Sequence, residues 1–250
     1  MIVTAFFTKN SCPAKTFLPI VFCVFTAAAN SQMPGDIVAK YIEFTGGSAA
    51  WKKVKTITSA GTYNYGGVEF PFIAYSKAPA LYKYIVTFNG KSFEQAYDGK
   101  NGWRIDGFKN EKQKTILTGH DAFAMANESD VELESPFIDY NKKGHIIQFQ
   151  GKDTVNGKVC YKIKLSRKNI DTATYFFSTG NYALIKKQAI AKNTELEKDL
   201  LDIFFDDYRS IGGLVMPHTI TYRSGPQTVL IITVNEIKLD LPIQDEIFKP

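Results

Sequence analysis

The chain has 250 residues and a formal net charge of +5, with 44% hydrophobic and 22% charged residues. This is enough apolar sequence to bury a core, which excludes a disordered chain. The mild positive charge comes without an arginine cluster or another nucleic-acid signature, so we expect no nucleic-acid partner. Binding to an anionic membrane surface is compatible with this charge but is not required by it.

Residues 1–32 have the pattern of a secretory signal peptide. The segment carries Lys9 and Lys15 and no acidic residue, then an apolar core over residues 17–25 and small residues over 26–32. We predict that it is removed and that the mature protein is exported to the periplasm as a soluble protein. An uncleaved anchor is the alternative, but the apolar core is shorter than the about 20 residues of a membrane span.

Cleavage leaves residues 33–250, which we predict to form a single domain. The net charge then falls to about +3. Cys12 and Cys23 leave with the leader, so Cys160 stands alone and no intramolecular disulfide can form. Because Cys160 lies in an alternating run, we interpret it as a packed thiol; a reactive thiol is the alternative, with no nearby motif to support it.

Two short helices open the mature chain. Apolar residues recur at helical spacing over residues 37–44, and Gly46-Gly47 ends the pattern. Ser48 can then cap a second helix over residues 49–54. We expect the two helices to plug one end of a sheet.

A first meander of strands comes next. Alternating runs occupy residues 56–65, 68–76, 81–88, 91–97 and 101–106. The turn signals between them, such as Gly66-Gly67 and Asn89-Gly90, are typical of hairpins. Sequential hairpins predict antiparallel neighbours.

Residues 118–140 differ from the alternating strands on either side and predict two short helices. One lies over residues 122–126, and the other begins at Ser129 and is limited by Pro136. Between two meanders, this insertion is well placed to lie over a concave sheet. We predict that Phe123, Met125 and Phe137 are the residues of a lid.

A second meander completes the chain. Its alternating runs occupy residues 145–150, 159–166, 173–178, 182–191, 196–208, 214–222 and 228–239. There is no linker, low-complexity tract or composition shift, which favours one β-rich domain.

Aromatic residues cluster in the first meander. An ordinary sandwich core would explain them, but the chain has too few helices, and no separable second sheet, to cover one large apolar face. Tyrosine also suits an apolar groove with a wet rim. We therefore predict that a hydrophobic ligand binds to a cavity wall, which consists of Tyr63, Phe70, Phe72, Tyr84, Val86, Phe88 and Phe93.

Catalytic motifs are absent from the sequence. His120, His145 and His218 fall in no zinc-binding spacing, and there is neither a nucleophile elbow nor a phosphate-binding glycine loop. We expect no catalytic residue, no metal and no cofactor, and hence a protein that is not an enzyme. A hydrolase built from distant carboxylates is the alternative that sequence leaves open.

Four segments resemble the LolA-like superfamily of periplasmic lipoprotein carriers and their relatives. They are the opening helix and first strand at 41–57, the hairpin at 97–103, the strand and turn at 205–217, and the ending at 234–250. The resemblance implies a mainly β fold: a half-closed antiparallel barrel of about eleven strands, with a few helices at the N-terminus and over the concave face.

The same resemblance implies a non-catalytic function. We expect a periplasmic carrier that binds a lipid, or the acyl chains of a lipoprotein, in the concave apolar face. The alternative is an envelope sensor or scaffold of the same fold that binds a protein partner. The partners are then a lipid or acylated lipoprotein, with an envelope membrane or protein as a further candidate, and we expect a monomer.

Overall fold

The computed structural model describes residues 33–132, 135–168, 170–191 and 199–250, without the side chains of 128–132. The predicted signal peptide lies outside these residues. The chain divides into two units, residues 1–31 and residues 32–250, and every described residue belongs to the second.

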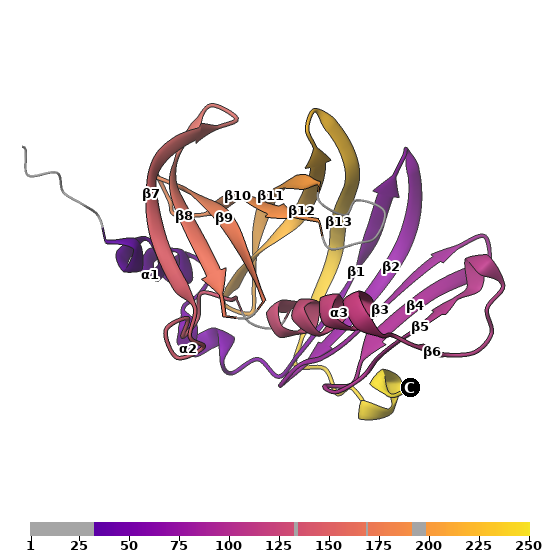
Figure 1. Cartoon of the computed structure of the whole chain (residues 1–250). Helices are drawn as coiled ribbons and strands as arrows, with labels where there is room; N and C mark the ends of the chain where they lie inside the picture. Colours follow the sequence, from indigo (N-terminus) through magenta and orange to yellow (C-terminus); the bar gives the residue numbers. More distant parts are fainter. Residues whose placement is uncertain (1–32, 133–134, 169, 192–198) are drawn as a thin grey trace, which may run out of the picture. The chain divides into compact units, whose positions relative to one another are not determined.

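One antiparallel sheet of thirteen strands forms the body of the described residues (Figure 1). The strands lie in the order β6-β5-β4-β3-β2-β1-β13-β12-β11-β10-β9-β8-β7. Their bounds are β1 Thr56–Tyr65, β2 Val68–Lys77, β3 Leu81–Phe88, β4 Lys91–Tyr97, β5 Gly102–Asp106, β6 Thr115–Ile116, β7 Ile146–Val155, β8 Lys158–Arg167, β9 Asp171–Ser178, β10 Leu184–Ile190, β11 Leu200–Ile211, β12 Leu214–Ser224 and β13 Gln227–Leu239.

The sheet joins the two meanders and stays open. β1 pairs with β13, so residues near the start and the end of the described chain lie side by side. Among the described residues, β6 pairs only with β5, and β7 only with β8, so these two strands are the edges. The predicted class, a mainly β half-closed antiparallel barrel, is confirmed. The sheet has thirteen strands instead of about eleven.

Helices are few and short. α1 (Pro34–Phe44) and α2 (Ser48–Trp51) precede the sheet, and α3 (Gly119–Glu132) connects its two halves. Two short 3₁₀ turns, η1 (Gly107–Lys109) and η2 (Asp245–Phe248), complete the set. None of the helices in the described part of the chain is long and apolar enough to cross a membrane.

The insertion forms one helix where the sequence predicted two. α3 runs without a break across the predicted boundary between residues 126 and 129. No glycine or proline stands at that boundary, so nothing stops the backbone hydrogen bonds from continuing.

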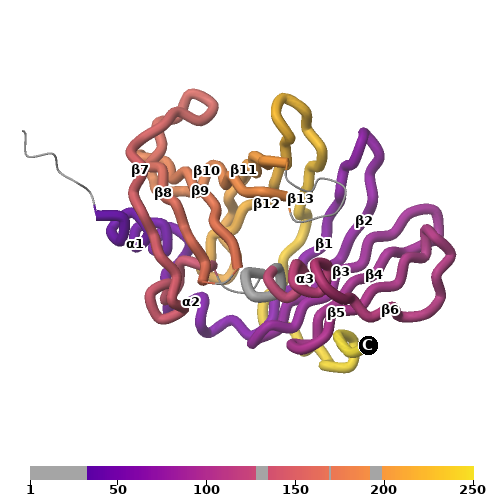
Figure 2. Tube along the Cα trace, viewed as in Figure 1, coloured from indigo at the N-terminus to yellow at the C-terminus, as the bar shows by residue number. Residues whose placement is uncertain are grey.

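The two faces of the sheet differ in what covers them. We call inner the face that carries Tyr84 and Ile163, because α3 and α1 pack on it. One inner cluster gathers β8 and β9 residues under Ile37 and Val38 of α1. A second gathers β2 and β3 residues under α3, which crosses the front of the curved sheet in Figures 1 and 2.

The outer face is covered by charged side chains and by the C-terminal residues. Lys162 and Lys186 lie over the ring of Phe176, at 5.6 and 4.4 Å from its centroid. These distances are measured from the Nζ atoms, so the ammonium groups themselves lie over the ring as cation–π contacts. Residues 240–250 cross the outer face of β2–β5 and end with Phe248 fully buried.

Candidate functional site

The seven predicted wall residues all lie on the inner face. Tyr63 is the cross-strand partner of Phe70 on β2, Phe72 is the partner of Val86 on β3, and Val86 is the partner of Phe93 on β4. Alternation along each strand then puts Tyr84 and Phe88 on the same face. The strand pattern therefore places the whole set on one side.

Ring contacts divide the wall into two patches. Tyr63 stacks on Phe72 with centroids 4.5 Å apart, and Tyr84 contacts Phe93 at 5.9 Å. Phe70 and Phe88 form a separate pair at 4.9 Å, close to the β1–β2 and β3–β4 turns. Tyr63, Phe72 and Tyr84 belong to the cluster under α3.

One of the two predicted lid residues on α3 packs against this wall. Met125 is 1% exposed and packs in the cluster that contains Phe72 and Tyr82. Phe123 is 46% exposed. Residues two apart on a helix point in different directions, which explains why only one of the pair reaches the sheet.

Phe137, the third predicted lid residue, lies in the other inner cluster. Its ring contacts Tyr41 of α1 at 5.8 Å, Tyr175 at 4.8 Å and Phe177 at 5.4 Å. Burial there raises the pKa of Tyr41 to about 12. Phe137 therefore covers β9 together with α1, whereas Met125 covers β2 and β3.

A row of half-buried apolar side chains connects the two clusters across the inner face. Phe205 of β11 pairs with Ile220 of β12, which pairs with Ile232 of β13, which pairs with Tyr63 of β1. All four side chains have intermediate exposure. The sequence prediction missed the first three, although their alternating strands carried the same signal as the first meander.

A polar group borders the wall beneath α3. The Tyr84 hydroxyl donates a hydrogen bond to Gln95 Oε1 at 2.9 Å, and Gln95 is the cross-strand partner of Arg104. The Arg104 guanidinium lies 3.7 Å from the carboxylate of Asp121 in the first turn of α3. The apolar wall thus has a polar border on the β4–β5 side.

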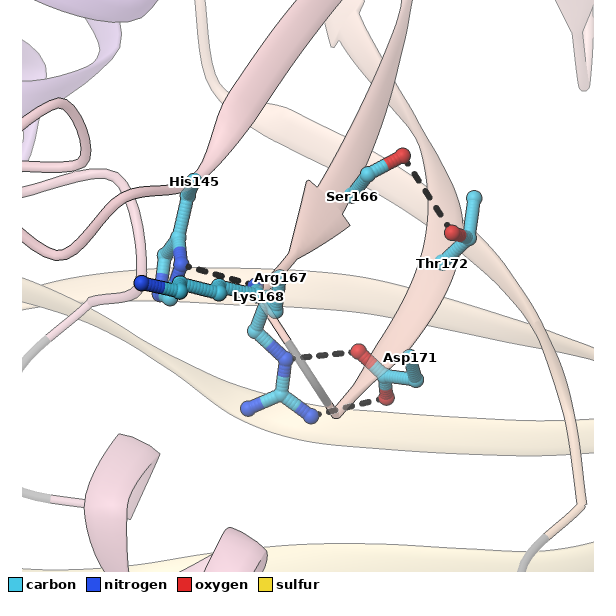
Figure 3. Close-up of polar contacts among 6 residues, drawn as sticks. All are labelled: His145, Ser166, Arg167, Lys168, Asp171 and Thr172. Atoms are coloured by element: carbon cyan, nitrogen blue, oxygen red, sulfur yellow. Dashed lines mark hydrogen bonds and ion pairs between the residues drawn. The ribbon is translucent and has the colours of Figure 1, made fainter.

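A second polar group closes the β8–β9 hairpin (Figure 3). Arg167 donates two hydrogen bonds to Asp171, at 2.6 and 2.7 Å, and its side chain is almost fully buried. The backbone N–H of Lys168 donates to His145 Nδ1 at 3.3 Å. A bidentate pair of this kind fixes the hairpin geometry, and we assign it a structural role.

The reactive side chains are scattered. Cys160 is buried on the outer face, and burial raises the pKa of its thiol, which favours the unreactive protonated form. His218 is buried on β12 with its Nδ1 3.1 Å from the Met216 carbonyl oxygen, and His120 stands at the start of α3. In the described ranges, no three His, Cys, Asp or Glu side chains gather in a way that could hold a metal.

Two cavities lie away from the predicted wall. One of about 400 Å³ is lined by residues of β8 to β11, including Ser178, Ile185 and Asp206. The other, of about 340 Å³, lies between β2, β3 and the C-terminal residues, with Tyr75 and Ile85 among its lining. Neither is lined by any of the seven wall residues, but Phe205 of β11 lines the first.

No protein-family model and no curated protein matches this sequence. Solved structures do resemble the fold. A DUF1329 family protein from Desulfovibrio piger has a TM-score of 0.58 at 14% identity, over 86% of this chain and 95% of that one. A putative outer membrane lipoprotein-sorting protein domain from Vibrio parahaemolyticus has a TM-score of 0.57 at 9% identity, with the same coverage.

A LolA superfamily protein from Nitrosomonas europaea has a TM-score of 0.53 at 13% identity, over 86% of this chain and 96% of that one. At these identities the likeness concerns the fold and not the ligand. The match covers nearly the whole described chain and agrees with the open antiparallel sheet and its few helices. The protein therefore has a LolA-like fold.

Proposed function

We propose that the mature protein is a non-catalytic periplasmic carrier that holds the acyl chain of a lipid or lipoprotein on the inner face of its sheet. One observation carries the proposal: the band of Phe205, Ile220, Ile232 and Tyr63 is half-buried and runs from the cluster under α1 to the cluster under α3. A contiguous apolar surface that the described residues leave partly exposed supports a binding site in a protein of this size.

The band has the geometry that a chain-like ligand needs. It crosses four neighbouring strands, and Phe205 contacts the α1 cluster while Ile232 contacts the α3 cluster. An acyl chain along it would touch both clusters. The polar border at Gln95 and Arg104 would remain next to water for a head group.

The energy of such binding suits a carrier that must release its load. Each buried methylene contributes about 0.8 kcal/mol, so a chain of about sixteen carbons would contribute about 12 kcal/mol gross if it were fully buried. An open band buries one side of the chain only, and ordering costs reduce the gain further. The expected affinity is therefore moderate and reversible.

Two neighbouring isoleucines on β13 provide the test. Ile232 lies on the inner face and Ile231 on the outer face, and both are half-buried. We expect delipidated protein to bind a fluorescent fatty acid saturably, Ile232→Gln to weaken this binding at least about tenfold, and Ile231→Gln to leave it within about twofold. Absence of saturable binding, or equal effects of the two variants, would contradict the proposal.

The scaffold alternative predicts a different result. Mass spectrometry of an organic extract of the purified protein should reveal a bound lipid if the protein is a carrier. An extract without lipid, together with recovery of one envelope protein in a pull-down, would favour a sensor or scaffold of the same fold.

A further inference from the structure

The last residues of the chain form a strap across the outer face. We call residues 240–250 the C-terminal strap. At its start, the Asp240 carboxylate accepts a hydrogen bond from the Lys55 backbone N–H at 2.7 Å, and the Leu241 carbonyl accepts one from Thr56 Oγ1 at 2.7 Å. Lys77 Nζ then donates to the Ile243 carbonyl at 2.6 Å. The first half of the strap is thus fixed to β1 and β2.

The other end of the strap is fixed to β5. The indole N–H of Trp103 donates to the Phe248 carbonyl at 2.7 Å, and both side chains are buried. Lys114 Nζ donates to the Lys249 carbonyl at 2.7 Å and lies 4.3 Å from the Trp103 ring centroid. The strap is therefore held at both ends and passes over β3 between them.

The cavity of about 340 Å³ lies beneath this span. Its floor is formed by Tyr75 of β2 and by Lys83 and Ile85 of β3, and its other side by strap residues Pro242, Ile243, Gln244 and Ile247. This volume falls at the lower end of the range for small-molecule sites. Ile85 and Val86 point to opposite faces, so this cavity is separate from the lipid-binding band.

The cavity is lined by both apolar and polar side chains. Ile85, Ile243 and Ile247 provide hydrocarbon, while Lys83 and Tyr75, which are cross-strand partners, provide an ammonium and a hydroxyl. Lys83 is 12% exposed in its side chain and is held by Glu94 at 2.9 Å and by the Trp103 ring at 5.1 Å. An ammonium has three donors, so Lys83 retains capacity to donate to a ligand.

We propose that the cavity under the C-terminal strap is a second binding site, which takes a short amphiphile with one hydrogen-bond acceptor, such as a short-chain carboxylate. The hydrocarbon lies between the strap isoleucines and Ile85, and the acceptor faces Tyr75 and Lys83. Pinning at both ends makes the site preformed, which lowers the ordering cost of binding. The site is independent of the band on the inner face.

The two tryptophans of the chain give a direct readout. In a ¹H–¹⁵N spectrum of the purified protein, Trp51 and Trp103 each give one indole N–H resonance, and only Trp103 is hydrogen-bonded to the strap. We expect sodium octanoate to shift the Trp103 resonance saturably and to leave Trp51 unchanged. From butanoate to octanoate, affinity should rise about fourfold per methylene, and it should level off for longer chains once the cavity is full.

Matched variants separate this site from the inner face. Ile85→Phe fills the cavity from its floor and Ile247→Phe fills it from the strap, so each should weaken octanoate binding at least about tenfold. Val86→Phe changes the opposite face and should leave the Trp103 shift intact. Tyr75→Phe should weaken binding about fivefold to tenfold by removing one donor.

Three outcomes would overturn the proposal. They are the absence of a saturable Trp103 shift, a shift that Val86→Phe abolishes while Ile85→Phe and Ile247→Phe do not, and affinity that keeps rising with chain length beyond the size of the cavity. The second and third would place octanoate on the inner face, and they would support the carrier function while rejecting the strap site. Dispersed indole resonances in each variant confirm that it is folded.

Discussion

At the scale of single residues, Gly61 shows how closely the strands approach at the wall. It follows a register shift in the pairing of β1 with β13. A Cβ at this position would lie 1.9 Å from the carbonyl oxygen of Thr233 and 2.9 Å from the ring of Phe72. Only glycine lets the backbone of β13 and the stacked Phe72 come this near.

We expect Gly61→Ala to destabilise the protein by about 2 to 3 kcal/mol, because backbone atoms must move to admit the methyl group. Gly180→Ala is the control, since its Cβ would make only an ordinary contact of 3.6 Å with Ser178 Oγ. Urea unfolding of both variants measures the difference. Equal stability of the two variants would show that the close approach at Gly61 does not restrict this position.

At the scale of elements, α3 combines a buried anchor with an exposed surface. Met125 packs against the wall cluster and Phe123 is largely exposed. If α3 acts as a cover of the wall, its attachment should depend on Met125 and only weakly on Phe123. The same cover could then move to admit an acyl chain without unfolding the sheet.

Truncation of these two side chains tests that arrangement. We expect Met125→Ala to cost about 2 to 4 kcal/mol of unfolding free energy, as for other large apolar residues cut back in a core, and Phe123→Ala to cost under about 0.5 kcal/mol. Met125→Ala should also increase hydrogen exchange in α3 before global unfolding. A larger effect of Phe123→Ala than of Met125→Ala would contradict this assignment.

The strands and turns were largely predictable from the local sequence pattern, whereas the way in which other segments cover the sheet was not. Turn signals such as Gly66-Gly67 and Asn89-Gly90 fix hairpins locally, and the structure has a hairpin at each. Alternation then fixed which wall residues share a face. Phe137 and Met125, twelve residues apart, cover different parts of the sheet, and no local signal says which part a connecting segment reaches.

Very short and capping elements were harder to predict for a similar reason. β6 has two residues, too few for any alternation to be read. The C-terminal strap is fixed by hydrogen bonds to Lys55, Thr56 and Trp103, which are far away in sequence. The cavity beneath it depends on this long-range placement and has no sequence signature.

At the scale of the described domain, the pairing of β1 with β13 holds the two meanders in one sheet. Every residue from Thr62 to Asn64 pairs on both sides, with β2 and with β13. β13 in turn pairs with β12, so the middle of the sheet unites the half under α3 with the half under α1. The apolar band crosses this junction, and its continuity depends on it.

Proline substitutions compare the junction with an edge. Thr233 pairs with Thr62 on one side and with Thr219 on the other, whereas Ile116 of β6 pairs with Trp103 alone among the described residues. The N–H of the next residue, Leu117, donates to the Gly102 carbonyl, so by antiparallel alternation the Ile116 N–H points away from β5. A proline at a central position removes a ladder donor and destabilises the sheet, while an edge position whose N–H faces outward tolerates it. We expect Thr233→Pro to destabilise the whole domain and to abolish fatty-acid binding, and Ile116→Pro to change the unfolding midpoint little. If Thr233→Pro unfolded in two separate transitions and kept one half native, the two meanders would be independent units, and the inner band could not act as one site.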